Sequence, residues 1–213
     1  MNVSEKPILL IHGYGLDPKG REKPDFRGRL TVLAAQELVR DGYVGKFVIT
    51  AGSQQAGEQE LAGPIFRQIK LNNPRVSVSD VIVSPVSGGT IGELTEYQRL
   101  SAGINTSRLA LIATETHLGR IKRRLKKKFG EQSNNISVYC VENVLTTNDR
   151  KWRYQGLVEK LRNSADELDF KKREKITSIV EMFPFGSQLI DRLSRLQNRW
   201  AIWSLIQKAL RTK

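Results

Sequence analysis

Five short runs of apolar residues, each followed at once by a polar or glycine-rich turn, constrain the fold of this chain most strongly. Their residues are apolar at consecutive positions rather than at alternate ones. This pattern predicts strands that helices cover on both faces, as in a parallel sheet. The runs span residues 8–11, 46–50, 81–83, 109–113 and 136–141.

Stretches with helical periodicity separate these runs. Apolar residues recur there at three- and four-residue steps, and Gly42 follows the first stretch as a helix stop. Alternation of strand and helix predicts right-handed crossovers and an open α/β sheet. We therefore predict a Rossmann-like three-layer sandwich with a mainly parallel five-stranded sheet over residues 1–150. The helical stretches span residues 30–38, 61–69, 91–103 and 117–129.

The pattern changes after residue 150, where we expect C-terminal helices. Residues 151–213 hold 14 basic and 7 acidic residues, and so contribute +7 to the net charge of +13. Apolar residues recur at helical steps over 189–206, and another helix is expected over 171–182. Two interpretations stay open. These basic amphipathic helices either pack on the first domain or dock on an anionic macromolecule or membrane surface.

Cysteine content and the N-terminal residues bear on the compartment. The single cysteine, Cys140, cannot form a disulfide within the chain, which fits a reducing environment. The first residues lack the basic and apolar regions of a signal peptide. No uncharged run approaches the ~20 apolar residues that a membrane span needs. We therefore expect a cytoplasmic protein.

Two histidines mark the expected ligand-binding edge. Ligands of open α/β sheets bind outside the carboxyl ends of the strands. His12 and His117, the only histidines of the chain, each follow an apolar run directly. We expect His117 to donate a hydrogen bond or proton to a ligand and Arg120, one turn later, to neutralise its charge. Glu93 or Glu60 would orient a polar group or serve as a base.

The segment Ser87-Gly88-Gly89-Thr90 opens a predicted helix. Its glycines allow close approach of the backbone to a ligand, and the first helical N–H groups attract an anion. Ordinary N-capping of the helix explains the same residues, so both interpretations stay open. Gly52 and Ser53, which follow the second run, are interpreted in the same two ways.

Several chemistries are disfavoured by missing motifs. Ile11-His12-Gly13 resembles the oxyanion segment of α/β-hydrolases, but the Gly-x-Ser-x-Gly elbow of that fold is absent. Neither a Walker P-loop nor a Gly-x-Gly-x-x-Gly fingerprint occurs. Two histidines and one cysteine far apart in the sequence do not make a structural zinc site, and we predict no metal ligands.

A basic run over residues 120–128 contains seven lysines and arginines in nine positions. Ile121, Leu125 and Phe129 recur every four residues beside it, which predicts one buried stripe on an otherwise solvated helix. No aromatic residues interleave the run for stacking on bases. We therefore do not expect nucleic-acid binding.

Several of these segments together resemble the bacterial YdcF/SanA/ElyC-like family over residues 7–142. The most specific match is Thr114 to Arg120, which resembles the family's His-x-x-Arg motif after the fourth strand. Glu93 stands where the family has asparagine, and Ser53 stands where it has a second turn glycine. The other matching segments are Arg29-Leu30, residues 49–52, Glu60 and residues 87–90.

The resemblance implies a Rossmann-type sandwich that binds a nucleotide-like ligand such as S-adenosylmethionine. Three functions fit the sequence. The first is binding of an anionic or nucleotide-like small molecule at the carboxyl edge, with enzymatic activity left open. The second is a non-enzymatic adaptor that docks through its basic helices. The third is a divergent hydrolase that uses His12 or His117 as its base.

Overall fold

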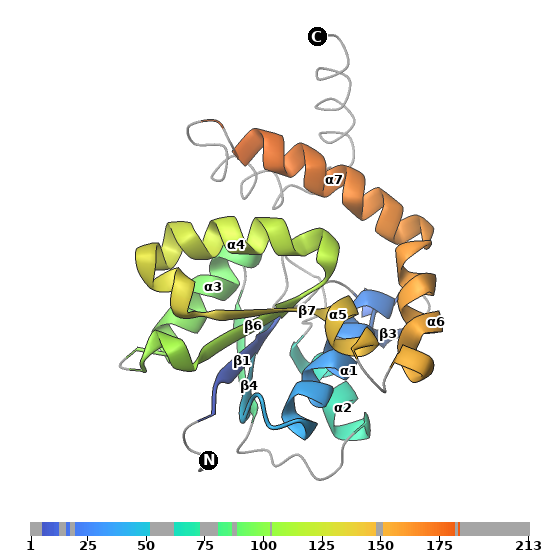
Figure 1. Ribbon diagram of the computed structural model, residues 1–213, viewed down its shortest axis with the longest axis horizontal. Helices are drawn as coiled ribbons and strands as arrows, with labels where there is room; N and C mark the ends of the chain where they lie inside the picture. Colours follow the sequence, from blue (N-terminus) through green and yellow to red (C-terminus); the bar gives the residue numbers. More distant parts are fainter. Residues whose placement is uncertain are drawn as a thin grey trace.

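The computed structural model describes residues 6–12, 16–17, 20–51, 62–72, 81–86, 89–102, 104–147, 151–181 and 183. These residues form the sheet and helices of Figure 1. The strands are β1 (Ile8–Ile11), β2 (Leu16–Asp17), β3 (Gly20–Pro24), β4 (Lys46–Ala51), β5 (Val81–Val86), β6 (Leu109–Ala113) and β7 (Ser137–Cys140). The α-helices are α1 (Phe26–Arg40), α2 (Ala62–Asn72), α3 (Gly89–Leu100), α4 (Glu115–Phe129), α5 (Val141–Thr146), α6 (Lys151–Arg162) and α7 (Ala165–Glu181).

The main sheet is parallel and has the strand order β5-β4-β1-β6-β7. The first apolar run lies at its centre: Ile8–Ile11 pairs with residues 46–49 of β4 on one side and residues 109–112 of β6 on the other. A short antiparallel pair, β2 with β3, lies outside it. Side-chain burial is described for β4, β1, β6 and β7, whereas β5 is described through its backbone pairing with β4.

Two apolar clusters lie on the two faces of the sheet. Successive side chains of a strand point to opposite faces, so Leu9 and Ile11 join one cluster while Leu10 joins the other. The first cluster holds apolar residues of α1, α2, α5 and α6, and the second holds those of α3 and α4. Helices therefore cover both faces, and the predicted α/β class with a parallel sheet is confirmed (Figure 1).

The predicted helices lie in α1, α2, α3, α4 and α7, with shifted boundaries. Gly42 follows α1 with a φ of 78°, a left-handed conformation that glycine adopts without strain. α7 begins earlier than predicted because Ser164 caps it, its hydroxyl oxygen accepting the Glu167 N–H at 3.1 Å. The stripe over 189–206 lies outside the described residues.

The two C-terminal helices attach to the fold in different ways. α6 contributes Tyr154, Val158 and Leu161 to the first apolar cluster. α7 contacts α4 instead, and its buried residues are Glu167, Glu174 and Thr177. α6 is thus anchored by apolar packing, while α7 is attached through polar groups. None of the described helices has the length and apolar character needed to cross a membrane.

Candidate functional site

His12 lies directly after β1 and is 1% exposed. Its Nδ1 makes a short hydrogen bond with the Glu93 carboxylate, which comes from α3 and is also buried. A carboxylate only accepts hydrogen bonds, so the proton of this bond lies on Nδ1; whenever the ring is neutral, Nε2 carries the lone pair. This Nε2 is buried and has no hydrogen-bond partner among the described residues. This orientation leaves Nε2 as the nitrogen of His12 that could accept a proton.

His117, in the first turn of α4, lies beside His12. The two rings are stacked, with centroids 5.8 Å apart and planes 17° apart. The Arg120 guanidinium lies 3.0 Å from His117 Nε2 through Nη2, and arginine only donates. Nε2 of His117 is therefore the acceptor, and the proton of its neutral ring lies on Nδ1.

The environment of His117 keeps its ring neutral. Burial lowers the pKa of His117 well below its usual value, and the positive charges of Arg120, Arg124 and Arg27 lower it further. His12 acts in the same direction. At neutral pH the ring is thus a hydrogen-bond donor through Nδ1 without a positive charge.

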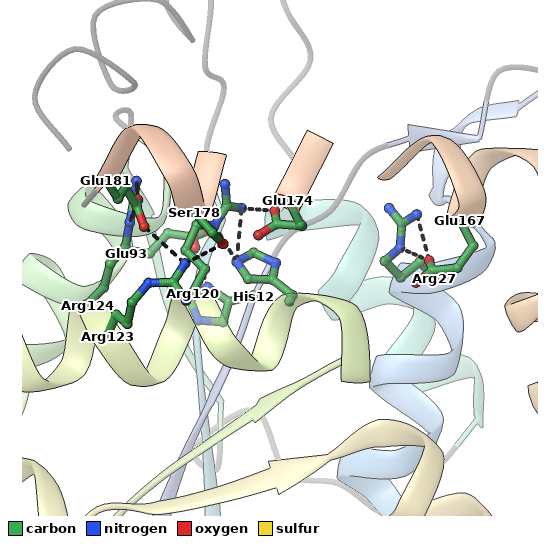
Figure 2. A network of polar contacts seen from close by, with 11 residues as sticks. His12, Arg27, Glu93, Arg120, Arg123, Arg124, Glu167, Glu174, Ser178 and Glu181 are labelled. Atoms are coloured by element: carbon green, nitrogen blue, oxygen red, sulfur yellow. Dashed lines mark hydrogen bonds and ion pairs between the residues drawn. The ribbon is translucent and has the colours of Figure 1, made fainter. Parts of the chain in front are cut away.

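Three arginines extend from this pair of histidines toward α7, and each contacts a glutamate of that helix. Arg27 of α1 pairs with Glu167 at 2.9 Å and lies 4.0 Å above the Phe170 ring. Arg120 pairs with Glu174 at 2.9 Å. Figure 2 shows these contacts side by side, with the glutamates on α7 facing the arginines. The third arginine, Arg124, donates two hydrogen bonds to Glu181, at 2.9 and 2.7 Å.

The prediction of a solvated basic face over residues 120–128 is wrong for two of its arginines. Ile121 and Leu125 are buried as expected. However, Arg124 is 6% exposed and the side chain of Arg120 is 15% exposed. Both lie under α7, where carboxylates replace water around their guanidinium groups. The lysines at 122, 126 and 127 are exposed.

The structure brings four of the predicted site residues together: His12, Glu93, His117 and Arg120. Gly89 and Thr90 begin α3, one turn before Glu93, and Thr90 is buried. The remaining predicted residues, Gly52, Ser53, Glu60, Ser87 and Gly88, lie outside the described residues.

Sequence reasoning missed Arg27 and the glutamates of α7. One signal for them was present, because Glu167, Glu174 and Glu181 recur every seven residues within a basic segment. Seven residues are almost two helical turns, so such acids share one helix face. Arg27 offered no comparable signal, since its partner is 140 residues away in the sequence.

The cluster places a carboxylate-bound imidazole, a second imidazole and two arginines in one region, an arrangement that can transfer a proton beside positive charge. Among the described residues, no three histidine, cysteine or acidic side chains form a group that could hold a metal ion.

Comparison of the chain with protein-family models, with curated proteins and with solved structures gave no match.

Proposed function

We propose that this chain is an enzyme that binds a small anionic or nucleotide-like molecule at the carboxyl edge of a Rossmann-like sheet. His12 is the general base, and it removes a proton from a water molecule or from a hydroxyl group of the ligand. One observation carries the proposal: His12 Nδ1 is held by a buried carboxylate, while Nε2 is buried and has no hydrogen-bond partner in the described part of the chain. Such a carboxylate fixes the tautomer of the ring and stabilises the imidazolium that forms.

Each neighbouring side chain has a role in this reaction. Nε2 of His12 takes the proton, and the Glu93 carboxylate balances the positive charge that the ring acquires. The Nδ1–H of His117 donates a hydrogen bond to an oxygen on which negative charge develops. Arg120 binds the anionic part of the ligand, since a planar guanidinium suits phosphate and carboxylate groups. The low pKa of His117 supports its role, because a neutral ring leaves the positive charge to the arginines.

The proposal includes the resemblance to the YdcF/SanA/ElyC-like family. The parallel sheet and the position of His117 and Arg120, one turn apart after β6, support it. S-adenosylmethionine and nucleotides are therefore the first ligands to test. Docking through the basic helices receives less support over residues 151–181, because α6 packs into the core and α7 lies against α4, with Phe170 beside His117.

Thermal shift and hydrolysis assays test the proposal together. The ligand panel comprises S-adenosylmethionine, ATP, glucose 6-phosphate and inorganic phosphate, since a ligand of the folded state must raise the melting temperature. p-Nitrophenyl phosphate and p-nitrophenyl acetate report hydrolysis. Loss of a general base typically lowers the rate by about 10²–10⁴-fold, and we expect His12→Gln to fall in this range.

Glu93→Gln should also lower the rate, because an amide cannot balance the charge on His12. Glu96→Gln is the matched control: Glu96 lies on the same helix and forms an ion pair with Arg99 near the surface. Its rate should equal that of the wild type. Full activity in His12→Gln, or no stabilisation and no turnover with any compound of the panel, would contradict the proposal.

A further inference from the structure

A row of acidic side chains on α7 faces a row of arginines. Glu167, Glu174 and Glu181 share one face of the helix because they are seven residues apart. In the same order, they contact Arg27, Arg120 and Arg124 at 2.9, 2.9 and 2.7 Å. Arg120 and Arg124 of α4 meet Glu174 and Glu181 of α7 in the same order, so the two helices run side by side in the same direction (Figure 1).

Glu174 occupies the position at which an anion would meet the histidines. Its Oε1 lies 2.9 Å from Arg120 Nη2, and the same nitrogen lies 3.0 Å from His117 Nε2. Its other oxygen, Oε2, is buried and has no hydrogen-bond partner among the described residues. One carboxylate oxygen thus binds the guanidinium as a ligand oxygen would, while the second oxygen is left unsatisfied.

Detachment of α7 from α4 should cost little free energy. The buried residues of α7, Glu167, Glu174 and Thr177, are all polar, and the half-buried Phe170 ring adds a contact with His117. Detachment of the helix returns both partners of each ion pair to water, and hydration then offsets most of the lost attraction. Burial raises the pKa of Glu174 in spite of the nearby arginines, so its charged form is better accommodated in water than in the docked position.

The junction of α6 and α7 provides a hinge. α6 is held in the apolar cluster by Tyr154, Val158 and Leu161, so it stays in place when α7 moves. The two helices are joined by a turn at Asn163 and Ser164. A change of backbone angles at these residues is sufficient to lift α7 from α4.

We propose that α7 is a displaceable acidic lid: Glu174 and Glu167 occupy the guanidinium groups of Arg120 and Arg27 that bind a phosphate-bearing ligand. The ligand enters by displacing the helix, and the free protein is held in a closed, autoinhibited state. The identity of the ligand class rests on the proposed function. The position of α7 over His117 rests instead on the contacts of Phe170 and Glu174.

The two histidines provide a direct test of the lid. Diethyl pyrocarbonate acylates accessible neutral imidazoles, and mass spectrometry assigns the products because the chain has only two histidines. In the wild type both should react slowly, since they are 1% and 4% exposed. Glu174→Lys places a cation against Arg120 and should open the lid, which raises the acylation rate of both by about tenfold or more.

Asp169→Lys is the matched control. It makes the same change of charge on the same helix, but the Asp169 side chain is 49% exposed. Its acylation rate should equal that of the wild type, and circular dichroism shows whether each variant is folded. A folded Glu174→Lys protein whose histidines stay protected would overturn the proposal, as would equal reactivity in the two variants.

Hydrogen exchange tests the lid in the unmodified chain, so the result does not depend on how a variant folds. Sodium phosphate, compared with sodium chloride at equal ionic strength, should accelerate amide exchange of residues 165–181. Amides of β6 and α5 should not change. Unchanged or slower exchange of α7 in phosphate would overturn displacement by the ligand. Histidine acylation and amide exchange are both measured without catalytic turnover. A negative result for the lid is therefore distinguishable from a negative result for His12 as a base.

Discussion

The neutral ring of His117 makes the stability of the folded protein depend on pH in a calculable way. Burial and the surrounding arginines hold the pKa of His117 well below its usual value of 6.5. The unfolded chain therefore binds a proton at this residue at a pH where the folded protein does not. Its contribution to stability is complete above pH 6.5 and is lost as the pH falls through that value toward the lower pKa of the folded state.

The size of this loss follows from proton linkage. Below the pKa of the unfolded chain, each pH unit lowers the free energy of unfolding by about 1.4 kcal/mol per group. Between pH 7.5 and pH 5.5 we therefore expect His117 to remove about 1.4 kcal/mol. For a chain of this length this corresponds to a decrease in melting temperature of roughly 3–6 °C.

Other buried groups change stability in the opposite direction. Burial raises the pKa of Asp25, Glu142 and Glu174, so the folded state retains their protons more strongly than the unfolded chain does. Their contribution grows as the pH falls toward 4.5. The effect of His117 is therefore obtained as the difference between the wild type and His117→Gln, which both contain these carboxyl groups.

Two measurements check this prediction. Urea unfolding of the wild type and His117→Gln from pH 7.5 to pH 5.5 should show the difference of about 1.4 kcal/mol. Nuclear magnetic resonance of the two imidazole rings should show that His117 does not titrate near pH 6.5, and that its Nδ1 carries the proton. A midpoint for His117 at or above 6.5, or a difference that does not vary with pH, would refute the reasoning.

Three further predictions concern contacts that hold the site together. Glu167→Gln leaves the Arg27 guanidinium without its carboxylate and should weaken the docking of α7 at a cost of about 1–2 kcal/mol, since detachment of the helix returns Arg27 to water; the loss should be smaller when Arg27 is Met, and equal losses in both backgrounds would contradict the pair. Tyr97→Phe removes a hydroxyl that bridges the backbones of β1 and β6 and should cost about 1–3 kcal/mol in urea unfolding, whereas wild-type stability would contradict the bridge. Glu142→Ala removes the carboxylate that accepts the first N–H of α4 at 2.8 Å and should cost about 1 kcal/mol, with Glu142→Gln losing less; equal stability of both variants would argue against the cap.

The strands of the parallel sheet could be predicted from the sequence because a strand that is covered on both faces needs apolar residues at consecutive positions. The run Ile8–Ile11 is apolar at every position, and the structure buries Leu9, Leu10 and Ile11 between two neighbouring strands and two helical layers. The same run places His12 at the carboxyl end of β1. The apolar run of β6 places His117 just beyond the carboxyl end of that strand. The carboxyl ends of parallel strands lie at the same edge of a sheet, so the sequence alone predicts both rings at that edge.

The partners of those histidines could not be predicted in the same way. Glu93 is 81 residues from His12, and neither its spacing nor its local sequence distinguishes it from Glu60. The relative placement of α3 and β1 decides which acid meets the ring. The same holds for Arg124, which lies in a strongly basic run and becomes buried only because α7 covers it.

The sequence by itself determined the strands of the parallel sheet and the gathering of both histidines at its carboxyl edge; the short pair β2 and β3 was not predicted. Only the tertiary structure decided that His12 binds Glu93 and that Glu167 and Glu174 of α7 pair with Arg27 and Arg120. The physical reason is the range of the interactions. The periodicity of apolar residues depends only on residues close together in the sequence. An ion pair between distant segments depends on how whole helices pack against each other.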